Sequence, residues 1–340
     1  MLQAIMEKPG CIKFNNIKKP KPKKNEVLIK VIRIGICGSD IHVFQGNHPY
    51  TKYPIIQGHE IYGKVAEMGP TAKNFSIDDQ VTVMPQLFCK SCYNCRIGRY
   101  NICSSLKVMG FQINGAAQEY FIITDELLIK LNNKLSPEEY TLIEPIAVAV
   151  HAIRRGGNVK GKNILIFGAG TIGNLVGQVV KTMGAKTVLS CDINDYKLNI
   201  AKKCGVDFTI NSKKDNLEEA IPKYFGENKA DLIFECVGYE ETISQAISNA
   251  RSGTTIVVVG IFSKKVKIDF GLIQDRELKV SGTLMYVKDD YLKALELAED
   301  GKLSLKELIS KTYPFIRFND AYQFIEEQKD SVMKIIMTID

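Results

Sequence analysis

Apolar runs of strand length alternate with helix-length segments through the middle of the chain, and this alternation limits the fold more than any other feature. NILIF (163–167) leads into an amphipathic segment at 171–185, and TVLSCD (187–192) leads into a second one. DFTI, DLIFECVG, TTIVVVG and ELKVSG follow, with helical segments between them. Strands that alternate with helices form a parallel sheet covered by helices on both faces. The region therefore predicts a doubly wound α/β domain.

A glycine-rich turn, GAGTIG, lies directly between the first of these strands and its helix. Its first glycine permits a tight turn, its second lets the backbone approach a pyrophosphate, and its third lets helix and strand pack closely. The N-terminus of the following helix attracts phosphate groups. We therefore expect a dinucleotide-binding turn made of Gly168, Gly170, Thr171, Ile172 and Gly173. A glycine-rich turn that binds no cofactor is the alternative.

The next strand ends in Asp192, some nineteen residues after Gly173. An acidic side chain in this place accepts hydrogen bonds from the adenosine ribose hydroxyls and repels the 2′-phosphate of NADP. NAD is therefore the expected cofactor. An aspartate that serves only the local turn is the alternative.

Four cysteines lie close together in LFCKSCYNCRIGRYNICSS, at the spacing C-x2-C-x2-C-x7-C. Four thiolates in one short loop can surround a tetrahedral zinc ion, whose sulfur ligands lie about 2.3 Å away. Disulfides fit less well because two-residue spacings seldom reach disulfide geometry without strain. Redox-active or unliganded thiols are further alternatives. We expect a structural zinc site, closed to substrate, at Cys89, Cys92, Cys95 and Cys103.

The remainder of the chain has a different pattern of apolar and turn-forming residues. Before residue 145 it holds short strand-like runs, such as EVLIKVIRIG, KVAEMG, QVTVMP and AQEYFIIT, separated by Gly, Pro, Asn and Asp turns. This pattern is typical of an antiparallel, barrel-like domain. After residue 282 a helix, DDYLKALELAEDGKL, and a strand, VMKIIMTI, resemble that first part again. We expect two domains, the first built from both ends of the chain.

Composition excludes several classes of protein. The chain has 340 residues, 45% hydrophobic and 24% charged, as in an ordinary globular protein of about two domains. It has no apolar stretch of about 18 residues and begins without an apolar signal core, so we expect a cytoplasmic protein and no membrane span. The net charge is +7, and its densest lysine run, NNIKKPKPKKNE, lacks aromatic residues. That run predicts a solvated loop and no nucleic-acid partner.

Cys37, in GICGSDIH, and His59-Glu60, in GHE, are unremarkable when each is taken alone. A catalytic zinc ion uses three protein ligands and keeps one position for water or substrate. Together with the other motifs, these residues are candidates for such a site.

These motifs resemble those of the zinc-dependent medium-chain alcohol and polyol dehydrogenases. GICGSDIH, GHE, the four-cysteine segment, LIEPIAVAVHA, GAGTIG and the acidic strand end occur in that family's order and spacing, over essentially the whole chain. The resemblance implies a GroES-like barrel catalytic domain of residues 1–146 and 281–340, and a Rossmann domain of residues 147–280. It also implies two zinc ions per chain, NAD, and a homodimer or homotetramer.

The resemblance also assigns zinc ligands. It places Cys37, His59 and Glu60 around the catalytic zinc, and Glu144 where simple alcohol dehydrogenases have another zinc-binding cysteine. Which of the two glutamates binds the metal directly stays open, and Glu144 could instead cap the helix that follows it. Asp40 matches the position that orients the zinc-binding histidine.

The implied chemistry is the oxidation of an alcohol. Zinc lowers the pKa of the substrate hydroxyl as a Lewis acid, and the carbinol carbon delivers a hydride to the nicotinamide. By the same resemblance, Ser39 accepts the hydroxyl proton, and the nicotinamide ribose passes it to His42 and so to solvent. Lys197 matches a ribose-binding lysine. A solvated His42 and a solvated Lys197 are the alternatives.

The substrate is constrained less well. Glu144 and the segment QGNHPYTKYPIIQGHE look like the sorbitol and sugar-acid (galactonate, gulonate) 5-dehydrogenase branch, and His48 in that segment is a candidate substrate contact. Met285, however, stands where sorbitol dehydrogenases have a substrate-binding arginine, and VSGTLMY also looks like butanediol dehydrogenases. Threonine dehydrogenases fit less well because they tend to have Asp-Pro at Glu144-Pro145. His151, in an apolar helix, is expected to be a packed residue.

The leading hypothesis is therefore an NAD-dependent zinc enzyme that oxidises a secondary alcohol of a polyol or sugar acid to a ketone. A butanediol-type or other secondary-alcohol dehydrogenase is the alternative within the same class. A binding or regulatory protein that keeps the fold without catalysis is the alternative from another class.

Overall fold

The computed structural model describes residues 1–339 and divides into two compact units, one of residues 1–144 with the chain from Ile309 on, and one of Pro145–Leu308. The sequence suggested the first boundary after residue 146 and the second after residue 280. The structure places the second boundary later because helix α10 (Lys288–Glu299) belongs to the second unit. Asp290 of that helix accepts hydrogen bonds from Arg154, at 2.7 Å, and pairs with the ring of His151, at 2.8 Å.

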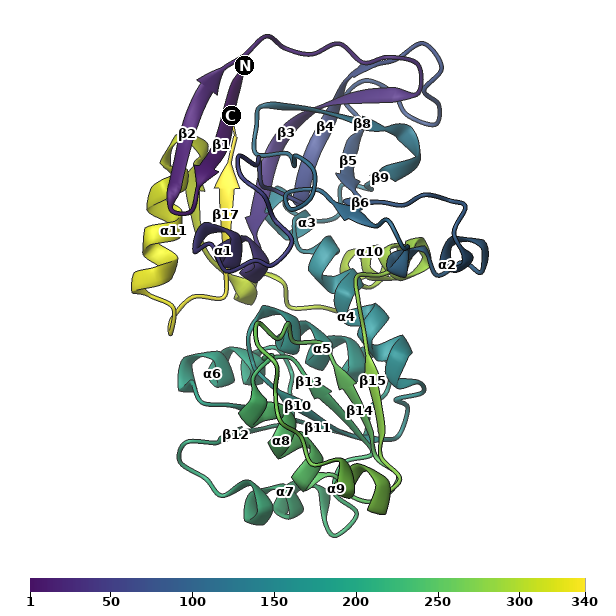
Figure 1. Ribbon diagram of the computed structural model, residues 1–340, viewed down its shortest axis with the longest axis vertical. Coiled ribbons are helices and arrows are strands. Elements are labelled where there is room, and N and C mark those ends of the chain that lie inside the picture. Colours follow the sequence, from purple (N-terminus) through teal and green to yellow (C-terminus); the bar gives the residue numbers. More distant parts are fainter. Residues whose placement is uncertain (340) are drawn as a thin grey trace. The chain divides into compact units, whose positions relative to one another are not determined.

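The first unit is built on a seven-stranded sheet in the order β16-β17-β3-β4-β5-β9, with β8 also paired to β3. The strands are β3 (Glu26–Ile36), β4 (Glu60–Met68), β5 (Gln80–Val83), β8 (Tyr120–Thr124), β9 (Leu128–Lys130), β16 (Ile309–Pro314) and β17 (Lys334–Thr338). All pairs are antiparallel except β16 with β17. Figure 1 shows the yellow C-terminal strand β17 beside the purple strand β3, so both ends of the chain build this unit, as predicted.

Shorter elements surround this sheet. A hairpin joins β1 (Leu2–Lys8) to β2 (Cys11–Asn16), and a two-residue ladder joins β6 (Gln86–Leu87) to β7 (Lys107–Val108). The helical pieces are α1 (Gly38–Phe44), α2 (Tyr93–Arg96), η1 (Tyr100–Ile102), η2 (Asp125–Leu127), α3 (Pro137–Tyr140), η4 (Phe315–Arg317) and α11 (Phe318–Glu327). Helix α4 (Ile143–Gly156) begins in the first unit and continues into the second.

The second unit has the predicted parallel sheet, in the order β12-β11-β10-β13-β14-β15. Its strands are β10 (Asn163–Phe167), β11 (Thr187–Asp192), β12 (Phe208–Asn211), β13 (Leu232–Glu235), β14 (Thr255–Val258) and β15 (Lys279–Gly282). Its helical pieces, besides α10, are α5 (Thr171–Thr182), α6 (Asp195–Lys203), α7 (Leu217–Phe225), α8 (Glu240–Asn249), α9 (Phe270–Asp275) and η3 (Lys306–Leu308). The strand order doubles back at β10, as in dinucleotide-binding sheets.

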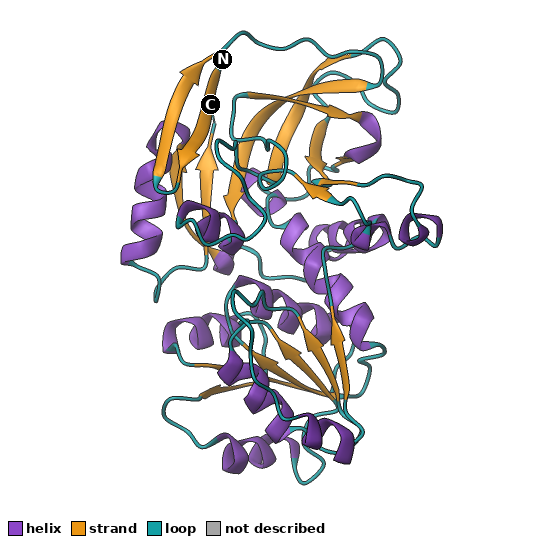
Figure 2. Cartoon of the chain, viewed as in Figure 1, coloured by secondary structure: helices purple, strands orange, loops and turns teal. Residues whose placement is uncertain are grey.

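Helices lie on both faces of this sheet (Figure 2). Every residue of β10 is buried, and Ile164–Phe167 form a continuous apolar run, as in strands covered on both faces. Leu165 and Phe167 belong to one core cluster with Ile221 of α7 and Ile247 of α8. Ile166 points the other way, toward the glycines of α5. The alternating side chains of a single strand thus hold both helical layers.

Within residues 1–339, no helix has both the length and the apolar character needed to cross a bilayer.

Candidate functional site

Cys37, His59 and Glu60 come together in the first unit, with their ligand atoms all within 4.8 Å of one another. Cys37 follows the end of β3, and His59 directly precedes β4. The two strands pair antiparallel with Gly35 opposite Glu60, so the end of one strand lies beside the start of the other. A thiol, an imidazole and a carboxylate in one buried cluster are a donor set that suits zinc.

Asp40 supports the imidazole of this cluster. Its carboxylate accepts hydrogen bonds from the Cys37 backbone, at 2.9 Å, and from Gln57, at 3.2 Å. Gln57 in turn accepts one from the Tyr322 hydroxyl at 2.7 Å. Asp40 Oδ1 lies 3.6 Å from His59 Nδ1, beyond hydrogen-bond length, so this buried nitrogen has no hydrogen-bond partner among the described residues. The fixed carboxylate still faces the ring, as expected for a group that orients a metal-binding histidine.

The electrostatics of the cluster favour a bound cation. Burial lowers the pKa of His59, but Asp40, Cys37 and Glu144 together outweigh burial and raise it to about 10. Negative groups that draw a proton this strongly to a ring nitrogen would favour a divalent ion in the same place. The residues present therefore fit a zinc ion.

Glu60 is tied to a residue that the sequence did not reveal. Lys334, from β17, donates hydrogen bonds to both Glu60 carboxylate oxygens at 2.7 Å and to the Ile36 carbonyl at 3.2 Å. The two side chains are 3% and 0% exposed. Gly35 makes room for this pair, because a Cβ at that position would lie 2.1 Å from a carboxylate oxygen of Glu60. Glu60 thus lies in the cluster with its negative charge already neutralised by Lys334.

Glu144 is buried in the first turn of α4, where its charge also raises the pKa values of His59 and Lys334. It lies outside the group of mutually close ligand atoms that holds Cys37, His59 and Glu60. Glu144 is thus near enough to affect the pKa values of the candidate zinc cluster but is not one of its mutually close ligands.

Ser39 and His42 lie one turn apart on α1, the helix that Cys37 precedes. Residues three apart share a face of a helix. Ser39 is partly buried beside the cluster, and His42, in the last turn, is exposed to solvent.

His48 lies in the loop after α1. Its Nδ1 pairs with the Thr51 hydroxyl at 2.8 Å, and its ring stacks on Phe111 at a centroid distance of 4.8 Å. The other neighbour of Phe111 is His59, 5.0 Å away. The loop around residue 111 can approach this closely because Gly115 and Ala116 bond to backbone carbonyls of residues 56 and 58.

The four-cysteine segment forms a second cluster, with all four sulfur atoms within 4.8 Å of one another. Sulfur–sulfur separations include 3.5 Å (Cys103–Cys89), 3.8 Å (Cys92–Cys103) and 3.9 Å (Cys89–Cys95). Four sulfurs about 2.3 Å from a shared zinc ion would lie about 3.8 Å apart. The thiols are not joined by disulfides. This geometry fits a zinc ion closed to substrate.

The glycine turn joins β10 to α5 in the second unit. Gly168 has φ = 96°, a conformation that favours glycine, and a Cβ on Gly173 would lie 1.8 Å from the Gly168 carbonyl. Apart from Gly170 itself and the adjoining backbone, no described atom lies within 4 Å of the place where a Cβ of Gly170 would stand. Gly170 precedes the N-terminus of α5, with Thr171 and Ile172 in the first turn. The backbone is thus open for a phosphate at this helix end.

Asp192, at the end of β11, reaches back to the glycine turn. One carboxylate oxygen accepts a hydrogen bond from the Ala169 backbone at 2.7 Å, and the other accepts one from Asn194 at 3.0 Å. Each oxygen keeps a further lone pair that can accept a hydroxyl proton. Lys197 lies in the first turn of α6, partly buried.

Three contributors to the first unit's site escaped the sequence: Lys334, Phe111 and the Gln57–Tyr322 pair. Lys334 comes from β17, Phe111 from the loop before β8, Gln57 from the loop before β4 and Tyr322 from α11. The antiparallel pairing of β17 with β3 brings Lys334 in. A signal was present for Lys334 alone, since a lysine inside the apolar run VMKIIMTI is rarely buried without a partner.

Comparisons with known proteins were consistent along the whole chain. Residues 23–133 match the alcohol dehydrogenase GroES-like domain, and residues 171–300 match the zinc-binding dehydrogenase domain. The chain is 33% identical to D-xylulose reductase of Saccharomyces cerevisiae, over 98% of this chain and 96% of that one. It is 31% identical to L-threonine 3-dehydrogenase of Pyrococcus horikoshii, over 97% and 96%. The crystal structure of galactitol-1-phosphate dehydrogenase from Escherichia coli matches with a TM-score of 0.92 and 28% identity, over 100% of both chains.

Proposed function

The chain belongs to the zinc-dependent medium-chain alcohol and polyol dehydrogenases, and from that premise we propose that it oxidises a secondary alcohol of a polyol or sugar acid to a ketone with NAD. The observation that carries the proposal is the cluster of half-buried Cys37 with buried His59 and Glu60, supported by Asp40. The three similar proteins act, by their names, on a ketose, on the 3-position of threonine and on a polyol phosphate. In each case the hydroxyl that reacts can be that of a secondary alcohol.

Cys37 and His59 are the proposed protein ligands of a catalytic zinc ion, together with one glutamate. Glu60 has a carboxylate oxygen in the close group of ligand atoms but already pairs with Lys334, whereas the buried Glu144 lies outside that group. Either glutamate is a candidate for the third ligand, directly or through water. When bound, zinc supplies Lewis-acid polarisation of the substrate hydroxyl. Glu60 then contributes a neutralised carboxylate next to the site, and Asp40 holds the His59 ring in one orientation.

Ser39 and His42 form the proposed route for the proton. The Ser39 hydroxyl oxygen would accept the proton of the substrate hydroxyl while giving up its own, and a ring nitrogen of His42 would take up a proton and release it to water. NAD, when bound, would supply the ribose hydroxyls that link the two side chains. Their placement supports this, since Ser39 lies beside Cys37 and His42 is exposed at the other end of the same helix. The route lets a buried site release a proton without admitting solvent.

The glycine turn and Asp192 are the proposed NAD site. The pyrophosphate would bind over Gly170 at the N-terminus of α5, and Asp192 would accept the adenosine ribose hydroxyls. Lys197, one turn into α6, is a proposed ribose contact. NAD supplies the hydride acceptor when it is bound. The carboxylate of Asp192 disfavours NADP because it would face the 2′-phosphate.

We further propose a cytoplasmic homodimer or homotetramer. Nine unpaired cysteines suit a reducing compartment. Strand β15 ends the parallel sheet, and Val280 on it and Leu284 after it are 39% and 52% exposed, which suits an interface with a second copy. Light scattering on the purified protein would test the assembly.

A substrate screen tests the proposed function. The zinc-loaded protein is mixed with NAD and a panel of polyols, aldonates, polyol phosphates, 2,3-butanediol and L-threonine, and NADH formation is followed by absorbance. Metal analysis on the same sample should give two zinc ions per chain. Turnover of a polyol or aldonate supports the proposal, and Cys37→Ser should abolish it. A sample with two zinc ions per chain that oxidises no secondary alcohol would refute it, and one zinc ion per chain would favour a silent binding protein.

A further inference from the structure

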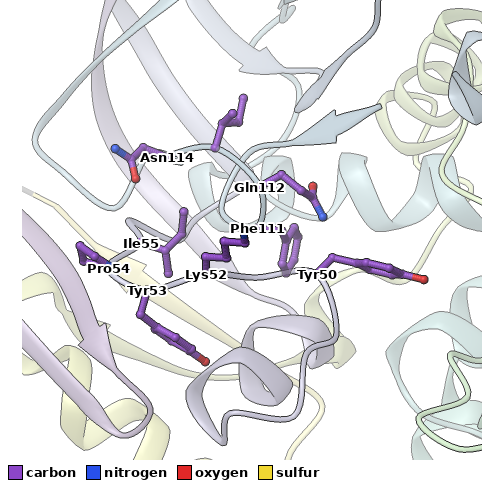
Figure 3. A pocket seen from close by; sticks show the side chains of 9 residues that line it. Tyr50, Lys52, Tyr53, Pro54, Ile55, Phe111, Gln112 and Asn114 are labelled. Carbon is purple, nitrogen blue, oxygen red and sulfur yellow. The ribbon is translucent and has the colours of Figure 1, made fainter. Parts of the chain in front are cut away.

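A cavity of about 650 Å³ lies in the first unit, lined by side chains from residues 50–55 and from 111–114 (Figure 3). Its volume is within the range of small-molecule sites. Both lining segments come from loops, and nothing in the site described so far occupies the cavity or uses its polar groups.

The cavity adjoins the catalytic cluster through one aromatic ring. Phe111 lines the cavity, and its ring centroid lies 5.0 Å from that of His59. The ring also stacks on His48, in the loop that leads to the cavity. The Phe111 ring therefore forms a wall that the cavity shares with the His59 side of the cluster.

Hydrogen bonds hold the two walls together. Ile56 donates its backbone N–H to the Asn114 side chain at 3.2 Å, and Gly115 donates to the Ile56 carbonyl at 2.6 Å. Ile55, which directly precedes Ile56, exchanges two backbone hydrogen bonds with Met6, of 2.9 and 3.0 Å. The walls are thus fixed before a ligand arrives, which lowers the entropy cost of binding.

Lys52 gives the cavity its charge. It is the one charged side chain in the lining, and no carboxylate lines the cavity. Figure 3 shows it directed toward the loop of Phe111 and Gln112. Its ammonium group makes no ion pair with any of residues 1–339. Gln112 accepts a hydrogen bond from the Val108 backbone at 2.8 Å, so its amide nitrogen is the group left to donate to a ligand.

We propose that this cavity binds the far end of the substrate and that this end is anionic, a carboxylate or a phosphate held by Lys52 and assisted by Gln112. The inference rests on the proposed function and narrows it from polyols in general to polyhydroxy substrates with an acidic terminus. A cation without a counter-charge beside a fixed polar wall gives an anion a charge-assisted hydrogen bond, and it gives a neutral hydroxyl much less. Lys52 is then a specificity-determining residue, and its contact is made equally in ground and transition states.

The test compares the neutral polyol, the aldonate and the polyol phosphate of one carbon skeleton, in a glucose and a galactose series. Lys52→Met should raise KM for the anionic substrates about tenfold and leave kcat unchanged, since the lost contact is not specific to the transition state. KM for the neutral polyol should stay within about twofold. Lys52→Arg should retain the wild-type preference. Lys24→Met, which removes the same charge from an exposed loop outside the cavity, should behave as wild type.

Calorimetric titration of the zinc-loaded protein with gluconate and with galactitol 1-phosphate gives a readout that does not require turnover. Anion binding that Lys52→Met weakens supports the inference, and whichever anion loses more affinity is identified as the natural terminus. A neutral polyol that binds or reacts better than both anions overturns it, as does an equal loss for neutral and anionic substrates. Failure of every alcohol to react would count against the proposed function, whereas Lys52-dependent anion binding would still support this cavity assignment.

Discussion

Replacing Lys334 by methionine tests how the buried charges of the catalytic cluster are balanced. The ammonium group lies 2.7 Å from both carboxylate oxygens of Glu60 and 3.2 Å from the Ile36 carbonyl, and the pair is almost fully buried. Methionine keeps the length of the side chain but leaves the Glu60 carboxylate without a counter-charge. Breaking a buried pair from one side costs about 3–5 kcal/mol because the remaining ion stays desolvated.

Hydrogen exchange measured by mass spectrometry, on protein stripped of zinc by a chelator, localises this loss. Because 1.4 kcal/mol is about a tenfold change in an equilibrium constant, amides of β3, β4 and β17 should exchange about a hundred- to a few-thousand-fold faster in the variant. The strands of the second unit serve as an internal reference and should not change. Adding Glu60→Gln to Lys334→Met should restore most of the protection, since the remaining group is then neutral. If the single variant exchanges like the wild type, Glu60 is not a buried charge and the reasoning fails.

Three further perturbations address other parts of the account. Gly35→Ala should push the Glu60 carboxylate away from Lys334, because the new methyl group would lie 2.1 Å from a carboxylate oxygen. The thermal midpoint of the first unit should fall by several degrees. An unchanged midpoint together with full activity would contradict that packing. Asp192→Ser should raise kcat/KM with NADP relative to NAD by about tenfold or more, measured in parallel assays; an unchanged ratio would remove Asp192 from the cofactor site. Cys95→Ser should reduce the zinc content from two ions per chain to one and speed hydrogen exchange in residues 88–106 while leaving the parallel sheet protected; a variant that still binds two zinc ions would contradict the assignment of the four-cysteine site.

The glycine turn and the strand and helix that flank it were predictable because they depend on contacts between neighbours in sequence, and the alternation of strands with helices then indicated a parallel sheet. NILIF, GAGTIG and the helix after them follow one another directly, and the strand–turn–helix unit formed as predicted. The antiparallel unit was predictable in outline, including the return of the C-terminal strand. Its second boundary was predicted too early because hydrogen bonds join Asp290 of α10 to His151 and Arg154 of α4. These partners precede Asp290 by 139 and 136 positions, and no local sequence pattern reveals such contacts.

The candidate site divides in the same way. Cys37 and His59 could be selected only together, because GICGSDIH and GHE occur with the other motifs in the order and spacing of a known family. Lys334 could not, because its partner lies 274 positions away and only the register of β17 on β3 and of β3 on β4 joins them. Phe111 and Lys52 likewise could not be predicted, because they come together only where two loops fold around one cavity. Candidate residues in local motifs could therefore be predicted from the sequence, whereas the charge balance and the proposed substrate contacts depend on the fold.

The most direct test of the central claim is to follow the hydrogen that the enzyme removes. A polyol or aldonate substrate found in the screen is prepared with deuterium on its secondary carbinol carbons. The zinc-loaded protein oxidises it with NAD, and the mass of the reduced cofactor is measured by mass spectrometry. Each reduced cofactor should carry one deuterium, and the product should be a ketone. Reduced cofactor without deuterium, or an aldehyde formed from a terminal carbon, would contradict it.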